Sequence, residues 1–368
     1  MDLTMRILKS ALAALLAFSA SSAALAQQSR LDLPVQQGDY TAHDFKFGTG
    51  ETLPELRLHY RTIGQPKRDA NGHVSNAVLI LHGTGGTGAQ FLGPQFAGVL
   101  FEPGQLLDAT KYYIILPDGI GHGGSSKPSD GMHAHFPSYD YDDMVAAQHL
   151  LLTEGLHVDH LRLIMGTSMG CMHSWVWGET YPGFSDALMP LACLPVQIAG
   201  RNRMMRKMAM DAIRNDPAWN NGEYTAQPPG LKTSLDMLLI MGSSPLQMQK
   251  QFPTREQADA YLEKFIRTRF ADTDANDFLY QFNSSRNYDP SVKLATITVP
   301  VVAINSADDF INPPELNIMP DAIRLVPHGK FILLPITDQT RGHGTHTLPA
   351  IWQSYLAELL KDSEPATR

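Results

Sequence analysis

The stretch LRLIMGTSMG, Leu161 to Gly170, decides the fold of this chain. Its first half, Leu161–Met165, is apolar except for Arg162 and predicts a buried strand, and a helical stretch begins near Cys171. Strand, sharp turn and helix are the context in which a G-x-S-x-G motif presents a serine nucleophile. The glycines matter because strand and helix can approach each other only where the turn lacks side chains. The sequence therefore predicts Ser168 as a nucleophile.

A serine hydroxyl needs a base that removes its proton, and a carboxylate orients that base. In the order typical of this motif, the serine comes first, the acid second and the histidine last. The predicted strand Val299–Ile304 runs into Asp308 and Asp309, and the loop after the last strand contains His343 and His346. We expect Asp309 and His343 in these roles. Asp308 is the alternative for the acid, and His346 is the alternative for the base.

A tetrahedral intermediate also needs two backbone N–H donors. One comes from the residue after the nucleophile, which is Met169, and one from the first loop between a strand and a helix. That loop, His82–Gly86, follows the strand predicted at Ala77–Leu81. Thr84 is the expected second donor.

The same loop contains GTGGTG at Gly83–Gly88, formally a G-x-G-x-x-G, so a dinucleotide-binding enzyme has to be considered. Such a site needs an acidic residue at a strand end about 20 positions further on, and Asp118 lies too far along. We therefore expect no cofactor.

Neither the histidines nor the cysteines predict a metal site. No acidic residue completes a catalytic zinc set around the candidate ligands, which are His133, His135, His157 and His160. Cys171 and Cys193 form neither a C-x-x-C pair nor part of a four-ligand spacing. Both lie in apolar surroundings, and we expect two buried free thiols, although an exported protein could still join them.

Short apolar β-like runs alternate with helical stretches, which is typical of a mostly parallel α/β sheet. Strands are predicted at Ala77–Leu81, Tyr113–Leu116, Leu161–Met165, Ala187–Leu191, Val299–Ile304 and Phe331–Leu334, a crossover helix within Asp140–Thr153 and a last helix at Leu348–Leu360. In residues 195–288 the β-runs stop, and Met-rich segments with Pro and Gly breaks indicate a helical cap. The cap divides an α/β core into residues 27–194 and 289–368.

Residues 1–26 have the features of a cleavable secretory signal. Arg6 and Lys9 stand at the start of an apolar stretch that is shorter than the ~20 residues of a membrane-spanning helix, and Ala24-Leu25-Ala26 ends the segment. We therefore predict a periplasmic or secreted protein without a stable membrane anchor. Because 37 acidic residues outnumber 29 basic ones, giving a net charge of −8, nucleic acid is not an expected partner. The sequence leaves a homodimer open.

The chain resembles the homoserine O-acetyltransferase branch of the α/β-hydrolase superfamily over nearly all of residues 27–368. The resemblance is carried by Leu56–Gly64, Phe136-Pro137, Asp142–Gln148, Gly166–Gly170, Asp216–Trp219, Gly222, Tyr224, Asp309, Pro313–Glu315 and Gly342-His343. It implies an α/β-hydrolase fold with a helical cap and a triad of Ser168, Asp309 and His343. The Pro-Pro spacing of the family favours Asp309 over its neighbour.

The chain departs from this family at two polar positions. The family's Asp directly after the catalytic His is Gly344 here, and its cap-helix Arg falls on Leu235. These losses remove the partners for the amine and carboxylate of a zwitterion, so we expect homoserine to bind poorly. In their place we expect an apolar slot lined by cap residues such as Leu235, Met237 and Leu238.

The leading hypothesis is an exported serine hydrolase that cleaves an ester or related acyl compound, with a largely apolar, uncharged group near the reacting carbon, through an acyl-enzyme on Ser168. Export would separate the enzyme from acetyl-CoA, a cytoplasmic donor, so water is the default acceptor. The alternative is an O-acyltransferase that passes the acyl group to an alcohol. A third hypothesis, from another class, is a non-catalytic ligand-binding module.

Overall fold

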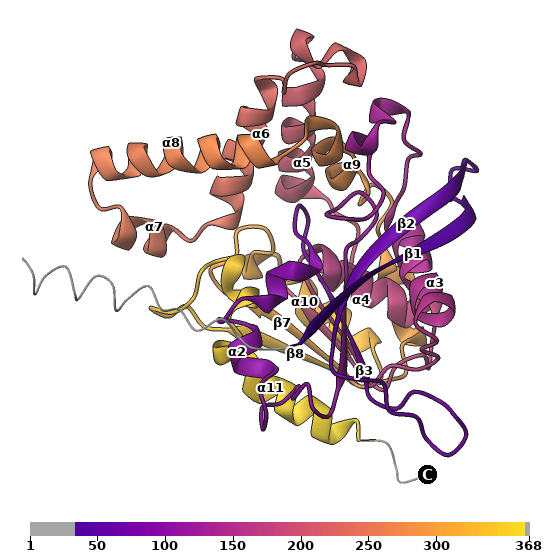
Figure 1. The fold of residues 1–368 in the computed structure, drawn as a ribbon. Coiled ribbons are helices and arrows are strands. Elements are labelled where there is room, and N and C mark those ends of the chain that lie inside the picture. The colour runs from indigo at the N-terminus through magenta and orange to yellow at the C-terminus, as the bar shows by residue number, and fades with distance from the viewer. Residues whose placement is uncertain (1–33, 365–368) are drawn as a thin grey trace, which may run out of the picture. The chain divides into compact units, whose positions relative to one another are not determined.

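The computed structural model describes residues 34–364 and contains one eight-stranded sheet within them (Figure 1). The predicted signal segment lies outside the described residues. The strand order is β1-β2-β4-β3-β5-β6-β7-β8. Their bounds are β1 Val35–Lys46, β2 Thr52–Ile63, β3 Ala77–Leu81, β4 Tyr113–Pro117, β5 Leu163–Thr167, β6 Leu188–Leu191, β7 Val301–Ser306 and β8 Gly329–Leu334. The pairs β1·β2 and β2·β4 are antiparallel and all other pairs are parallel, so the predicted mostly parallel α/β fold is confirmed.

Each of the six predicted strands overlaps an observed one, but the prediction missed β1 and β2. These two strands form a long antiparallel pair at one edge of the sheet, with Val35 opposite Ile63. Burial along β2 falls on separated positions such as Leu53, Leu56 and Leu58, with exposed residues between them. The missed strands are thus half-exposed ones, whereas β3, β4 and β5 are buried throughout.

Helices cover both faces of the sheet (Figure 1). The core helices are α2 Ala97–Leu100, α3 Tyr141–Leu150, α4 Met169–Thr180, α10 Ile318–Ala322 and α11 Pro349–Asp362. On one side, Phe96 beside α2 packs on Trp352 of α11, with ring centroids 6.0 Å apart. On the other, Trp177 of α4 donates a 2.8 Å hydrogen bond to Gln148 of α3. The predicted crossover helix begins after Asp140, which forms a reciprocal capping box with Asp143.

A set of helices follows β6 and has a hydrophobic cluster of its own. The helices are α5 Gly200–Arg214, α6 Gly230–Gly242, α7 Pro245–Gln251, α8 Arg255–Asp272 and α9 Ala275–Asn283. The cluster is built around Met205, Met210, Ile213, Leu231, Leu235, Phe278 and Phe282. These helices lie inside the range 195–288 predicted for the cap, and we call them the cap. No helix within residues 34–364 is long and apolar enough to cross a membrane.

The expectation of two free thiols was wrong, because Cys171 and Cys193 form a disulfide. Cys171 lies in the first turn of α4, which follows β5, and Cys193 lies just after β6. Since β5 and β6 are adjacent parallel strands, the segments that leave their carboxyl ends run side by side. The pairing of strands therefore brings together two cysteines 22 positions apart in sequence, with 5.8 Å between their Cα atoms.

Candidate active site

Ser168 occupies a strained turn between β5 and α4. Its φ of 55° and ψ of −109° lie outside the regions that a residue with a side chain normally adopts. A Cβ at Gly166 would collide with the backbone carbonyl of Gly170, and a Cβ at Gly170 would collide with that of Leu81. The glycines therefore permit the close contact of strand and helix that the sequence predicts for this turn.

Ser168, His343 and Asp309 form a continuous hydrogen-bonded series. The hydroxyl of Ser168 lies 2.8 Å from Nε2 of His343, and Nδ1 of His343 lies 2.8 Å from Oδ2 of Asp309. Asp309 follows β7, and His343 lies in the loop between β8 and α11. The Asp309 side chain is fully buried and that of His343 is 11% exposed. With Nδ1–H donating to the carboxylate, Nε2 is free to accept the serine proton.

Hydrogen bonds keep the Asp309 carboxylate ionised. Its Oδ1 accepts from the backbone N–H of Ile311 at 2.8 Å, and its Oδ2 accepts from the Asn312 amide at 2.9 Å. Burial by itself would raise the pKa of Asp309, but the electrostatic interaction with the His343 ring and these hydrogen bonds outweigh it, so the pKa lies below its ordinary value. A buried negative charge is thereby held against the imidazole.

The two competing residues have other positions. Asp308 accepts hydrogen bonds from the hydroxyl of Ser306 and, at 2.9 Å, from the backbone N–H of Gly342. His346 is half-buried, its ring lies edge-on to that of His343, and desolvation lowers its pKa to about 3. Of the four candidates, the structure brings only Asp309 and His343 into line with Ser168.

The predicted oxyanion loop lies directly beside the nucleophile. A Cβ placed on Gly83 would lie 3.2 Å from Cβ and 3.8 Å from Oγ of Ser168. Among residues 34–364, the backbone N–H groups of Thr84 and Met169 donate no hydrogen bond to another protein group. Two unused donors next to Ser168 are what a developing oxyanion needs.

His82 fixes this loop, a role that the sequence did not predict. Its Nδ1 donates to the Gly83 carbonyl at 2.9 Å, and its Nε2 accepts from the backbone N–H of Gly119 at 2.9 Å. Its own carbonyl accepts from Gly170 of the nucleophile turn at 3.0 Å. Burial lowers the pKa of His82, so the ring is neutral and can both donate and accept. Its position directly before the Gly-rich loop is the only sequence signal for this function.

A cavity of about 330 Å³, which we call the serine cavity, opens at Ser168 and His343. Its wall is mostly apolar and includes Met172, Leu194, Val196, Ile198, Phe310, Ile311, Leu316 and Ile318. Arg201 lines it as well, but its guanidinium donates to the Phe310 carbonyl at 2.6 Å and lies over the Phe310 ring. The space next to the nucleophile therefore suits an apolar group.

A second cavity of about 270 Å³, which we call the loop cavity, reaches Thr84 from the cap side. Leu235 and Leu238 line it, as expected for the predicted slot. The expectation of an apolar slot was nevertheless wrong, because five charged residues share the wall, namely Lys127, Arg269, Asp272, Asp274 and Asp277. They come from segments far from Leu235 in sequence, so only the packing of the cap reveals them. Met237 packs against the cap cluster and Gly344 follows His343, and neither lines the two cavities.

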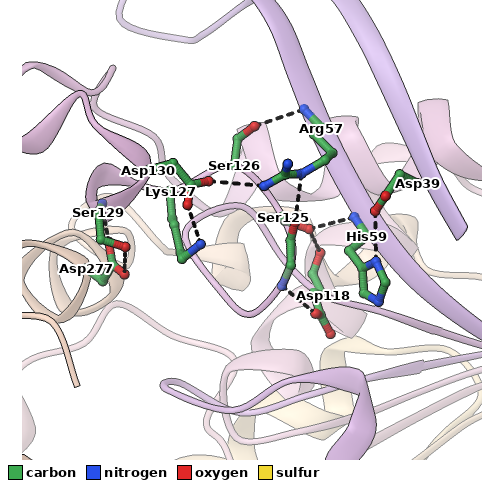
Figure 2. Close-up of polar contacts among 11 residues, drawn as sticks. Asp39, Arg57, His59, Asp118, Ser125, Ser126, Lys127, Ser129, Asp130 and Asp277 are labelled. Atoms are coloured by element: carbon green, nitrogen blue, oxygen red, sulfur yellow. Dashed lines mark hydrogen bonds and ion pairs between the residues drawn. The ribbon is translucent and has the colours of Figure 1, made fainter. Parts of the chain in front are cut away.

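Segment 118–130, which contributes Gly121, Gly123 and Lys127 to the loop cavity, is tied to both the sheet and the cap (Figure 2). Ser125 accepts from the backbone N–H of His59 at 2.9 Å and donates to the Asp118 carbonyl at 2.7 Å. Further along, Ser129 donates through its N–H and its hydroxyl to Asp277 of α9, at 2.9 and 2.6 Å. Asp118, excluded above as a ribose-binding acid, serves as an acceptor for Arg61 and two backbone N–H groups. Segment 118–130 thus connects β2 with the cap.

No group of three or more His, Cys, Asp or Glu residues in the described part of the chain could hold a metal ion. His133 and His135 lie in a short helical turn, and His160 pairs with Asp186 at 2.9 Å. What the site offers is a nucleophile, a base, a buried carboxylate and two N–H donors, a set suited to acyl transfer.

The fold and the site agree with the similarity to known proteins. A family model described as the alpha/beta hydrolase fold matches residues 76–343, and the chain belongs to this family. Within it, the chain lies in a branch that resembles homoserine O-acetyltransferases. The homoserine O-acetyltransferase of Chlorobaculum parvum is 28% identical over 327 residues, which cover 81% of this chain and 87% of that protein.

Other relatives carry different names. A probable acyltransferase from Methanothermobacter thermautotrophicus is 27% identical over 305 residues, covering 83% of this chain and 91% of that protein. Among solved structures, the acetyl esterase MekB superposes with a TM-score of 0.74 at 23% identity, covering 91% of this chain and 98% of that one. The similarity to MekB shows that the two chains share a fold. The proteins similar to this chain thus carry acyltransferase names among the sequence relatives and an esterase name among the solved structures.

Proposed function

We propose that this protein is an exported serine esterase that hydrolyses esters with an apolar acyl group through an acyl-enzyme on Ser168. The observation that carries the proposal is the series Ser168–His343–Asp309, with 2.8 Å at both hydrogen bonds. Such a series occurs where a serine must be activated, and the unused N–H donors beside it match the second requirement of acyl transfer.

The reaction follows from these positions. Oγ of Ser168 attacks the acyl carbon while its proton passes to Nε2 of His343, and Asp309 stabilises the imidazolium that forms. The backbone N–H groups of Thr84 and Met169 bind the oxyanion. His343 then gives its proton to the departing alkoxide, which leaves as the alcohol. A water molecule, deprotonated by His343, attacks the acyl-enzyme, and the carboxylic acid leaves as Ser168 regains its proton.

The serine cavity favours an acyl group larger than acetyl. Its volume of about 330 Å³ is some ten times the ~30 Å³ that one water molecule occupies in the liquid. A short acyl group would leave most of this apolar wall in contact with trapped water or void, whereas a chain of several carbons would fill it. We therefore propose medium-chain esters as the preferred class.

Export remains part of the proposal, and the disulfide supports it. Disulfides persist in oxidising compartments such as the periplasm and are rare in the cytoplasm. Cys171 and Cys193 form one, and Cys171 lies three positions after Ser168. An enzyme in an oxidising compartment such as the periplasm has access to water as the acyl acceptor but not to acetyl-CoA as a donor.

Acyl transfer to an alcohol is the second candidate, because the relatives include a probable acyltransferase and a homoserine O-acetyltransferase. It uses the same acyl-enzyme but keeps water out beneath the cap. The ratio of hydrolysis product to transfer product, measured with a supplied alcohol, separates the two.

The proposal is tested by labelling the purified protein with a fluorophosphonate and measuring turnover of 4-nitrophenyl esters from two to eight carbons. We expect labelling at Ser168, its loss in Ser168→Ala, and its retention in the control Ser75→Ala, which alters an exposed serine. Turnover should not depend on acetyl-CoA plus homoserine. Acetylation of homoserine would favour the second candidate, and a protein that neither reacts with the probe nor cleaves any ester would be a binding module.

A further inference from the structure

A groove lies on the cap beside the loop that carries His343 and adjoins the loop cavity. It measures about 580 Å³ and is lined by α6, α7 and α8 together with Arg341. Tyr261 and Phe265 of α8 form part of its wall, and Tyr261 stacks on Phe252 at the end of α7 with 4.1 Å between ring centroids. We call it the cap groove. Figure 1 shows α7 and α8 on the side of the cap away from β1 and β2.

The charge of the cap groove is opposite to that of the chain. The chain has a net charge of −8, yet the residues that line the groove include two arginines, Arg269 and Arg341, and no Asp or Glu. A locally positive concave surface raises the concentration of anions near it.

Arg269 is the stronger of the two anchors. Its side chain is half-buried, and within residues 34–364 its guanidinium takes part in no hydrogen bond and no ion pair. One Nη atom lies 3.9 Å from where a Cβ on Gly85 would be, so the guanidinium faces the backbone next to Thr84. Arg269 and Leu238 line both the cap groove and the loop cavity. The groove therefore continues into the loop cavity.

The carboxylates of the loop cavity do not neutralise Arg269. Asp274 accepts from the Tyr224 hydroxyl at 2.7 Å and from the Gln227 amide at 2.9 Å, and Asp277 accepts from Ser129. Asp272 is exposed at the rim. None of the three forms an ion pair with Arg269, which leaves its five N–H donors for a ligand.

Two further donors face the same groove. Arg341 uses Nη1 to hold three backbone carbonyls of residues 338–340, at 3.3, 3.0 and 3.1 Å, while its Nε and Nη2 have no partner in the described part of the chain. Ser244 is only 1% exposed, and its hydroxyl is buried without a hydrogen-bond partner. A buried hydroxyl without a partner is uncommon in folded proteins and indicates a ligand or solvent oxygen at that point.

We propose that the cap groove binds an anionic group, a carboxylate or a phosphate, on the part of the substrate that lies away from Ser168. Arg269 and Arg341 supply the charge, Ser244 supplies a neutral donor, and the loop cavity connects this group with the oxyanion loop. Charge-assisted hydrogen bonds to planar oxyanions are what guanidinium groups form best. This inference rests on the proposed function, because it assigns the second half of the same substrate.

The test measures binding, so that it does not depend on turnover. Ser168→Ala is titrated by calorimetry with monomethyl suberate, which carries one carboxylate, and with coenzyme A, which carries phosphates. Dimethyl suberate and pantetheine are the neutral counterparts. We expect at least one anionic probe to bind tenfold or more tightly than its counterpart. Adding Arg269→Met and Arg341→Met should remove this difference, while Arg267→Met, an exposed arginine on the same helix, changes it less than twofold.

Each result decides one question. If monomethyl suberate binds more tightly than dimethyl suberate, the cap groove binds a carboxylate. If coenzyme A binds more tightly than pantetheine, the cap groove binds a phosphate, which favours the acyltransferase candidate. Equal affinity for anionic and neutral probes, or a preference that persists in the double arginine variant, overturns the proposal. Ser244→Ala should weaken binding of the anionic probe severalfold. The variant should still fold, since the hydroxyl that it removes has no hydrogen-bond partner in the described part of the chain. Absence of ester turnover in the wild-type protein, with the anion preference intact, would refute the esterase and not the groove.

Discussion

Asp308 and Asp309 are adjacent in the chain but hold different parts of the loop that carries His343. Asp309 accepts from the imidazole at 2.8 Å, whereas Asp308 accepts from the backbone N–H of Gly342 at 2.9 Å. One carboxylate orients the ring and the other holds the peptide next to it. Two neighbouring acids therefore position one catalytic histidine by separate contacts.

Replacing each acid should give a different defect. Asp309→Asn should lower kcat by about 10³–10⁴ with little change in stability, because the amide disfavours the required tautomer of His343. Asp308→Ala should lower the free energy of unfolding by about 1–3 kcal/mol, because it leaves a buried N–H of Gly342 unpaired, and reduce kcat less. Ester kinetics and urea unfolding of both variants check this. A larger kcat loss in Asp308→Ala than in Asp309→Asn would reverse the assignment.

The disulfide should contribute to stability. It closes a loop between residues 22 positions apart, for which chain entropy predicts about 3 kcal/mol. Cys171→Ser combined with Cys193→Ser should therefore lower the free energy of unfolding by about 2–4 kcal/mol. Urea unfolding of the wild-type protein with and without a reductant provides the control, since the reduced protein should match the double variant. Two thiols that react in the folded, unreduced protein would contradict the bond.

The serine cavity should set the accepted chain length. Ile198 lines it, and Ile198→Trp would fill part of its volume. We expect kcat/KM for a 4-nitrophenyl octanoate to fall tenfold or more and that for the acetate to change less than threefold, because only the longer chain needs the lost space. Leu325→Trp, at a residue 52% exposed and outside the cavity, is the matched control. An equal loss of kcat/KM for both esters would mean that the acyl chain lies outside the serine cavity.

Asp277 should make stability depend on pH. Burial raises the pKa of this carboxyl to about 6 from 3.8, although hydrogen bonds from Ser129 oppose the shift. Between pH 3.8 and pH 6 the folded state holds a proton on Asp277 that the unfolded state has lost. Protonation of this group therefore favours the folded state at low pH. The stabilisation is lost as the pH rises through 6. One pKa unit corresponds to about 1.4 kcal/mol, so the full effect is about 3 kcal/mol.

Asp277→Asn should therefore be more stable than the wild-type protein above pH 7 by about 1–3 kcal/mol, with a difference that shrinks towards pH 4. Urea unfolding at several pH values measures it. A constant difference at all pH values would mean that the carboxyl stays charged throughout and that the effect comes from the lost hydrogen bonds alone.

The nucleophile turn could be predicted from the sequence because its constraints are local. The spacing of Gly166, Ser168 and Gly170 and the apolar run before them specify a strand, a strained turn and a helix with no information from distant residues. The buried parallel strands were predictable for the same reason, since an uninterrupted apolar run such as Ala77–Leu81 is visible in isolation.

Other features depend on residues that approach each other only in the folded protein. The disulfide requires β5 and β6 to be neighbours, which sequence separation does not reveal. The choice between Asp308 and Asp309 depends on the turn after β7, and their residue type alone leaves it open. Arg269 comes from α8, 34 positions after Leu235, and meets it at one cavity only through the packing of the cap. Strands β1 and β2 were missed because neither contains a continuous apolar run. Exposed residues separate the buried ones in both strands.

All three members of the series Ser168–His343–Asp309 lie outside the cap, which occupies Gly200 to Asn283 between β6 and β7. The cap enters and leaves the core through residues 192–199 and 284–300, so its length and sequence can change while the reacting atoms keep their places. Insertions, deletions or a transplanted cap would therefore act on the choice of substrate and not on the bond-making step. In an engineering experiment, this segment is the part to exchange, and the core is the part to leave untouched.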